Sequence, residues 1–166
     1  MSTAYVLPVR VYYEDTDHGG VVYYANYLKF MERCRTEFLR ERGLEQDELI
    51  NEQDLIFAVR RVEADYLQPA KFNDLLFVTA EIVQKTRVKV VFKQQVFKKK
   101  TVTTPVDSKT ASSFTSMSGY FDNIEKITGD SILLCKAEVT IVSLSASKMQ
   151  PKRILKTTFK EFMCEH

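Results

Sequence analysis

The spacing of hydrophobic and polar positions changes along the chain and predicts an early helix among strands. Residues 5–13 alternate between apolar and polar side chains, which is the two-residue period of a half-buried strand. From about 25 to 42, apolar residues recur every three or four positions, as on the buried face of an amphipathic helix. The residues of this stripe are Tyr27, Phe30, Met31, Cys34 and Phe38. Gly43 is a suitable residue to end the helix.

Strand-like runs with a two-residue period fill much of the remaining chain. They cover about 55–67, 75–84 and 87–98, and a last run covers 131–143. Residues 45–53 are expected to form a short polar helix or a loop. One early helix followed by antiparallel strands is the pattern of an α+β fold, in which the helix covers one face of the sheet.

An insertion rich in Ser, Thr and Lys interrupts this pattern at about 98–130. Ten of the residues from Thr101 to Ser118 are Ser or Thr. Such a composition predicts a surface insertion between two strands. A phosphate-binding or partner-binding role for Lys98, Lys99 and Lys100 is a weaker alternative. We also expect a short tail helix at the C-terminus.

The composition fits one soluble domain that spans residues 1–166. The chain has 24 basic and 22 acidic residues, and this near-balance argues against a dedicated nucleic-acid binder. The three cysteines are far apart and lack metal-ligand spacing, which predicts reduced thiols in the cytoplasm. We find no signal-peptide pattern and no apolar run long enough for a membrane span.

The segment 12–35 carries the candidate chemistry, because an acidic turn with two glycines directly precedes the helix. A helix N-terminus has unpaired N–H groups and a partial positive charge, so it stabilises developing negative charge. Asp15 or Asp17 could simply cap the helix or form a turn. Alternatively, a carboxylate faces a carbonyl whose oxygen binds the first N–H groups, as a nucleophile or general base beside an oxyanion hole. The residues alone leave both interpretations open.

The same segment does not fit a metal or nucleotide site. A calcium loop that begins at Asp15 would place Gly19 where an oxygen-bearing side chain is needed and Asn26 where an acidic, bidentate ligand is needed. His18 has only His166 as a companion, so a zinc ligand set is lacking. Phosphate-cradling loops, dinucleotide fingerprints and nucleophile elbows are absent from the sequence as well. We therefore expect no metal and no cofactor.

Residues 13–27, YEDTDHGGVVYYANY, resemble the signature of the 4-hydroxybenzoyl-CoA thioesterase branch of the hotdog superfamily. Within that branch they most resemble the bacterial acyl-CoA thioesterases associated with the Tol-Pal system. The likeness continues through 32–38, 66–70 and 74–76, and it covers most of the chain. It implies a hotdog fold, in which a curved antiparallel sheet wraps around one long central helix. This agrees with the α+β order of elements.

The resemblance implies hydrolysis of an acyl-CoA or aroyl-CoA thioester to CoA and the free acid. By position, Asp17 matches the catalytic carboxylate, acting as nucleophile or general base. The backbone N–H of Tyr24 matches the group that polarises the thioester carbonyl, and Tyr13 matches a tyrosine that accompanies the aspartate. The Tol-Pal-associated members commonly carry His where this chain has Tyr24, whereas the hydroxybenzoyl branch has Tyr. A backbone donor does not depend on that side chain.

The family also implies where the substrate and partner subunits bind. Arg87 and Lys89 match basic residues that bind the CoA phosphates, although solvated charges at a strand end are an equal alternative. Arg60 and Arg61 are weaker candidates. Family members join sheets edge to edge with the active site at the dimer interface, which implies a homodimer or homotetramer. The alternatives are a thioesterase acting on acyl carrier protein and a hotdog binding or scaffold protein with weak hydrolysis.

Overall fold

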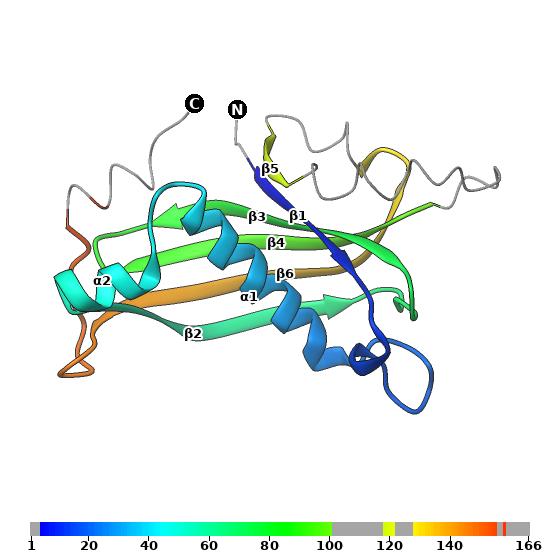
Figure 1. Ribbon diagram of the computed structural model, residues 1–166, viewed down its shortest axis with the longest axis horizontal. Coiled ribbons are helices and arrows are strands. Elements are labelled where there is room, and N and C mark those ends of the chain that lie inside the picture. The colour runs from blue at the N-terminus through cyan, green and yellow to red at the C-terminus, as the bar shows by residue number, and fades with distance from the viewer. Residues whose placement is uncertain (1–3, 101–117, 122–127, 156–157, 159–166) are drawn as a thin grey trace.

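A computed structural model describes residues 4–100, 118–121, 128–155 and 158. It contains a six-stranded antiparallel sheet with the strand order β2-β6-β4-β3-β1-β5, and helix α1 crosses one face of that sheet (Figure 1). The elements are β1 (Ala4–Arg10), η1 (Tyr13–Asp15), α1 (Tyr24–Arg40), α2 (Gln46–Gln53), β2 (Leu55–Tyr66), β3 (Leu75–Lys85), β4 (Lys89–Lys99), β5 (Gly119–Phe121) and β6 (Ser131–Ser145). The predicted α+β class is confirmed.

The core lies between α1 and the sheet. Phe30, Met31 and Cys34 on the predicted stripe are fully buried, and the Cys34 thiol donates to the carbonyl of Val78 on β3 at 3.3 Å. Burial of these apolar side chains, each contributing about 1.5–3 kcal/mol, holds the helix on the sheet. Gly43 has φ +73°, a left-handed conformation that suits glycine, and it follows the end of the helix as predicted.

The strand predicted over 5–13 is too long. The structure ends β1 at Arg10, and residues 13–15 form a turn of 3-10 helix. The alternation of side chains continues through Tyr12 and Tyr13, but these rings are 63% and 83% exposed. Aromatic residues are common in strands, so the exposed Tyr12 and Tyr13 made the predicted strand too long. The segment left open over 45–53 is helix α2.

The predicted insertion contributes a short strand that the periodicity did not indicate. Its residues 119–121 form β5, which pairs with β1 and covers that edge of the sheet. The hydroxyl of Tyr120 donates to the carbonyl of Phe38 at 2.6 Å, which ties β5 to α1. Residues 101–117 and 122–127 of the insertion, and 159–166, where we expected a tail helix, lie outside the described residues.

Candidate active site

The turn between β1 and α1 is held against the segment that follows β2. The N–H of Val11 donates to the carbonyl of Asp74 at 3.0 Å, and the N–H of Val22 donates to the carbonyl of Ala70 at 2.8 Å. The hydroxyl of Tyr27, on the first turn of α1, accepts from the N–H of Ala70 at 2.9 Å. These contacts fix the start of the helix and the acidic turn in one position.

Asp15 is the structural carboxylate of the turn. It is buried, and its Oδ2 accepts a hydrogen bond from the N–H of Tyr12 at 2.8 Å. Its carbonyl accepts from the N–H of Tyr23 at 2.9 Å and from the side-chain amide of Asn26 at 2.8 Å. The Asp15 carboxylate thus holds the 3-10 turn, and neither aspartate side chain caps α1.

Asp17 is exposed and is held by its own tight turn. Its Oδ1 accepts from the N–H of Gly19 at 2.8 Å, and its carbonyl accepts from the N–H of Gly20 at 3.0 Å. A Cβ at position 19 would lie 3.1 Å from that Oδ1, so any larger residue there would press on the carboxylate. Within the described part of the chain, Oδ2 accepts no hydrogen bond. One carboxylate oxygen is thus fixed, and the other is available to a ligand.

The N-terminus of α1 follows the turn that carries this carboxylate. The helix begins at Tyr24, and the preceding Tyr23 provides no side-chain cap. We find no described residue that accepts from the N–H of Tyr24, which is expected for the first residue of a helix. A hydrogen bond with the Tyr24 side chain raises the pKa of Tyr23, as do the negative charges of Tyr24 and Asp17. The site thus combines an exposed carboxylate with a helix N-terminus, which in general carries a partial positive charge.

Aromatic rings lie at the helix end and in the turn before it, and two of them, Tyr66 and Phe72, were not predicted as site residues. The ring of Tyr24 lies 4.7 Å from that of Tyr23 and 6.1 Å from that of Tyr66, at the end of β2. Tyr13 lies in the same turn, and its ring contacts Phe72 at 6.5 Å. The sequence signal for both is their position. Tyr66 lies at the end of the strand predicted over 55–67, and Phe72 follows that strand.

Arg87 and Lys89 lie at the other end of the sheet. Leu75 at the start of β3 pairs with Arg10, beside the acidic turn, whereas Lys85 at its end precedes the two cations. Ten residues of antiparallel strand span about 34 Å. The structure of one chain therefore does not bring Arg87 and Lys89 to Asp17.

The weaker basic candidates have local partners or lie in solvent. The Lys98 ammonium forms an ion pair with Asp74 at 2.7 Å, whereas Lys99 and Lys100 are exposed. Arg60 and Arg61 are exposed on β2, where a bulge interrupts the pairing with β6, and Arg61 pairs with Glu63.

In the described part of the chain, His, Cys, Asp and Glu do not gather in groups of three or more that could hold a metal ion. Likewise, the described helices include none that is long and apolar enough to cross a membrane.

Comparison with known families identifies the fold and the reaction class. The model of the thioesterase superfamily that includes 4-hydroxybenzoyl-CoA thioesterase matches residues 19–104. The chain belongs to this superfamily. It is similar to the acyl-CoA thioester hydrolase YbgC of Escherichia coli, with 34% identity over 161 residues, or 97% of each chain. It also resembles the acyl-CoA thioesterase YbgC of Haemophilus influenzae, with 45% identity over 98 residues, or 59% of this chain and 72% of that one.

Solved structures agree with this assignment. A probable thioesterase from Bartonella henselae superposes with a TM-score of 0.68 and 26% identity, covering 92% of this chain and 99% of the other. A 4-hydroxybenzoyl-CoA thioesterase variant in complex with 4-hydroxybenzoyl-CoA superposes with a TM-score of 0.73 and 16% identity, covering 95% and 97%. The second likeness concerns the fold alone. The expected hotdog fold and thioesterase family are confirmed.

Proposed function

We propose that this chain hydrolyses acyl-CoA thioesters to CoA and the free acid at the turn between β1 and α1. The observation that carries the proposal is the exposed Asp17 carboxylate, with one oxygen fixed, in the turn that leads into α1, whose first N–H, that of Tyr24, has no acceptor among the described residues. A nucleophile or base next to an oxyanion donor is what acyl transfer requires. The names of the curated relatives support CoA as the carrier of the acyl group.

The Asp17 carboxylate and the N–H of Tyr24 define the steps of the proposed reaction. Asp17 either attacks the thioester carbon directly or removes a proton from a water that attacks it. In both routes the carbonyl electron pair moves onto oxygen, where the N–H of Tyr24 and the positive end of α1 stabilise the charge. Collapse of this intermediate breaks the C–S bond and releases the CoA thiolate. In the direct route, water then hydrolyses the acyl-aspartate anhydride. Tyr13 borders the same turn and contributes to the substrate surface.

A second copy of the chain completes the site in this proposal. β2 is an edge strand of the sheet, and it exposes 52% of Val59 and 37% of Val62. An edge strand has unpaired N–H and C=O groups, which are a template for pairing with another chain. Antiparallel pairing of two β2 strands would bring the end of the partner sheet that carries Arg87 and Lys89 towards Asp17. Those cations would then bind the phosphates of CoA.

The proposed assembly is a homodimer, and pairing of two dimers would form a homotetramer. Sedimentation equilibrium distinguishes these two states. We also propose a cytoplasmic location, which the free, buried thiols of Cys34 and Cys135 support, because exported proteins use disulfides more often.

Substitution of Asp17 tests the proposed reaction. We expect Asp17→Asn to lower the turnover of acetyl-, octanoyl- and benzoyl-CoA by about 10²–10⁴-fold, the usual contribution of a catalytic acid or base. Glu14→Gln is the matched control, since it neutralises another exposed carboxylate in the same turn, and it should change turnover less than about twofold. The rate at which CoA thiol is released measures the turnover of both variants. Normal turnover by Asp17→Asn would remove this residue from the mechanism.

The same assay separates CoA from acyl carrier protein as the substrate carrier. Octanoyl groups attached to CoA and to a carrier protein are compared at equal concentration. The proposal predicts a higher kcat/KM for the CoA form, and a strong preference for the carrier-bound form would contradict it.

A further inference from the structure

Three basic residues meet at one corner of the sheet, where the turn between β3 and β4 contacts the segment that follows β6. Arg87 lies in the turn, Lys89 begins β4, and Arg153 belongs to the segment. The N–H of Ile154 donates to the carbonyl of Arg87 at 2.9 Å, which holds Arg153 against the turn. The fold thus brings a third basic residue, remote in the sequence, to the two that the sequence predicted. These three residues are called the basic corner below.

Arg153 and Lys89 lie on the same face of the sheet. Each directly precedes a residue of the core, Ile154 and Val90, which are 6% and 2% exposed. The N–H groups that bond the segment to the sheet are those of Lys152 and Ile154, two residues apart, as in an extended strand. Successive side chains of an extended chain point to opposite faces. Arg153 and Lys89 therefore both lie on the face opposite to the core and α1.

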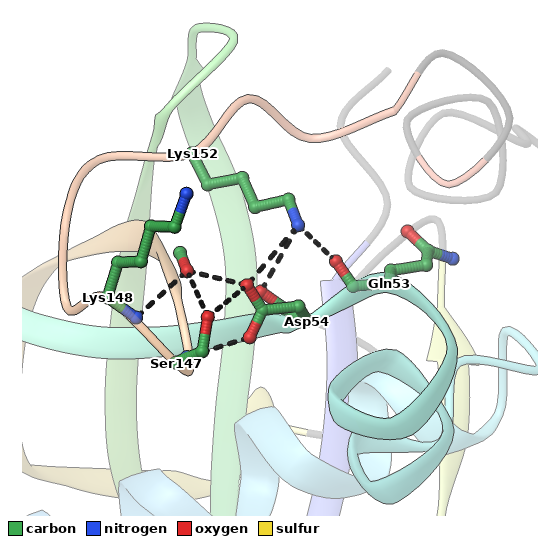
Figure 2. Close-up of polar contacts among 6 residues, drawn as sticks. Gln53, Asp54, Ser147, Lys148 and Lys152 are labelled. Carbon is green, nitrogen blue, oxygen red and sulfur yellow. Dashed lines mark hydrogen bonds and ion pairs between the residues drawn. The ribbon is translucent and has the colours of Figure 1, made fainter.

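The basic corner has no acidic partner in the described part of the chain, where no carboxylate lies within ion-pair distance of its three residues. The ammonium of Lys89 donates to the neutral amide oxygen of Gln84 at 3.1 Å, and both arginines are exposed. The carboxylate of Asp54, at the same end of the sheet, is held by Ser145 and Ser147 (Figure 2). Surface charges of one sign attract ligands of the other, so the corner suits an anion.

The charges of CoA exceed what two of these residues can balance. CoA carries a diphosphate and, on its ribose, a separate 3′-phosphate. Arg87 and Lys89 match the two negative charges of the diphosphate. The 3′-phosphate is a monoester, and such a group carries about −1.5 to −2 charges at neutral pH. The planar guanidinium of an arginine binds a phosphate through two parallel hydrogen bonds, which makes Arg153 a suitable partner for it.

We infer that Arg153 binds the 3′-phosphate of CoA and so makes the site select CoA over carriers that lack this group. The inference rests on the proposed function, in which Arg87 and Lys89 bind the other phosphates of CoA. The phosphopantetheine arm of an acyl carrier protein has no 3′-phosphate, and neither has 3′-dephospho-CoA. Recognition by Arg153 therefore gives a physical reason for a preference for the CoA form of a thioester.

A pair of substrates isolates the contribution of the 3′-phosphate. Acetyl-CoA and acetyl-3′-dephospho-CoA carry the same thioester, so the ratio of their kcat/KM values reports the phosphate alone. We expect Arg153→Gln to lower this ratio by at least about fivefold, the effect of losing a hydrogen bond between charged groups at the surface. Lys148→Gln is the matched control, since it removes an exposed cation beside Ser147 and Asp54 (Figure 2) and should change the ratio less than about twofold. An unchanged ratio in Arg153→Gln would overturn the inference.

Calorimetric binding of CoA and of 3′-dephospho-CoA, which need no hydrolysis, separates this inference from the proposed function. The wild type should bind CoA more tightly, and Arg153→Gln should lose most of that difference. If it does so while the wild type hydrolyses no acyl-CoA, the proposed reaction fails and the role of Arg153 stands. If the wild type hydrolyses acetyl-CoA but binds both ligands equally, the reaction stands and the role of Arg153 fails. Inorganic phosphate at the concentration of CoA should not displace it, and equal displacement would overturn the inference in favour of a general anion site.

Discussion

The hydroxyl of Tyr27 and the backbone N–H of Ala70 form a buried hydrogen bond of 2.9 Å that joins α1 to the segment after β2. The carbonyl of Ala70 accepts in turn from the N–H of Val22, at the end of the acidic turn. Ala70 thus bridges the helix and the turn that carries Asp17. The position of the carboxylate relative to the helix end depends on this bridge.

Tyr27→Phe should destabilise the protein by about 1–3 kcal/mol, because it leaves the buried N–H of Ala70 without a partner while the ring volume is kept. Urea denaturation measures the free energy of unfolding. Tyr12→Phe is the matched control, since that ring is mostly exposed, and it should change stability by less than about 0.5 kcal/mol. Equal stability of the two variants would show that the bond contributes nothing.

The sequence predicted most elements because their hydrophobic periods coincide with burial. On β6, for example, Ala137 and Val139 are buried whereas Glu138 between them is exposed, and the predicted and observed bounds differ by two residues. The prediction was wrong where aromatic residues that continue the strand pattern are exposed, as Tyr12 and Tyr13 are. β5 was missed because three residues carry too little periodicity to indicate a strand.

The candidate site could be predicted only in part. Asp15 and Asp17 both precede the helix, and composition could not decide which is structural. The decision comes from contacts that depend on the turn geometry, since Asp15 accepts from the N–H of Tyr12 and binds Asn26. The place of Arg153 beside Arg87 could not be predicted either, because it depends on the hydrogen bond between Ile154 and Arg87 in the folded chain.

Asp54 joins the end of α2 to the loop that follows β6 (Figure 2). Its left-handed backbone, with φ 48°, directs the carboxylate to the hydroxyl of Ser145 at 2.6 Å and to the N–H of Ser147 at 2.7 Å. The ammonium of Lys152 lies 3.6 Å away. The hydrogen bond from Ser145, with smaller contributions from Ser147 and Lys152, lowers the pKa of Asp54 to about 2.

This shift predicts the pH dependence of stability. The pKa of Asp54 is lower in the folded than in the unfolded chain. The stability that this carboxylate contributes is therefore complete above about pH 4 and is lost as pH falls towards 2. Asp54→Asn keeps a residue that tolerates the left-handed conformation but has no charge. The stability difference between wild type and variant should therefore be largest at pH 6 and should shrink below pH 4.

Urea denaturation at pH 6, 5, 4 and 3 measures this difference for Asp54→Asn. Glu48→Gln removes an exposed carboxylate from the same helix and controls for the loss of a charge. A difference that stays constant from pH 6 to pH 3 would mean that the carboxylate interactions do not act as described.

The backbone of Tyr24 can be tested as the oxyanion donor by removing its N–H. Tyr24 is the first residue of α1, a position where proline fits without loss of a helix hydrogen bond. Tyr23 has φ −58° and ψ 131°, the extended conformation that a residue before proline prefers. Tyr24→Pro should therefore fold, whereas Tyr24→Ala is the control that removes the same ring and keeps the N–H. Loss of one oxyanion donor typically costs about 10²–10³-fold in kcat. We expect the kcat of the proline variant to be lower than that of the alanine variant by that factor. Equal circular dichroism spectra would show that both variants fold. Equal kcat values would rule out the backbone donor.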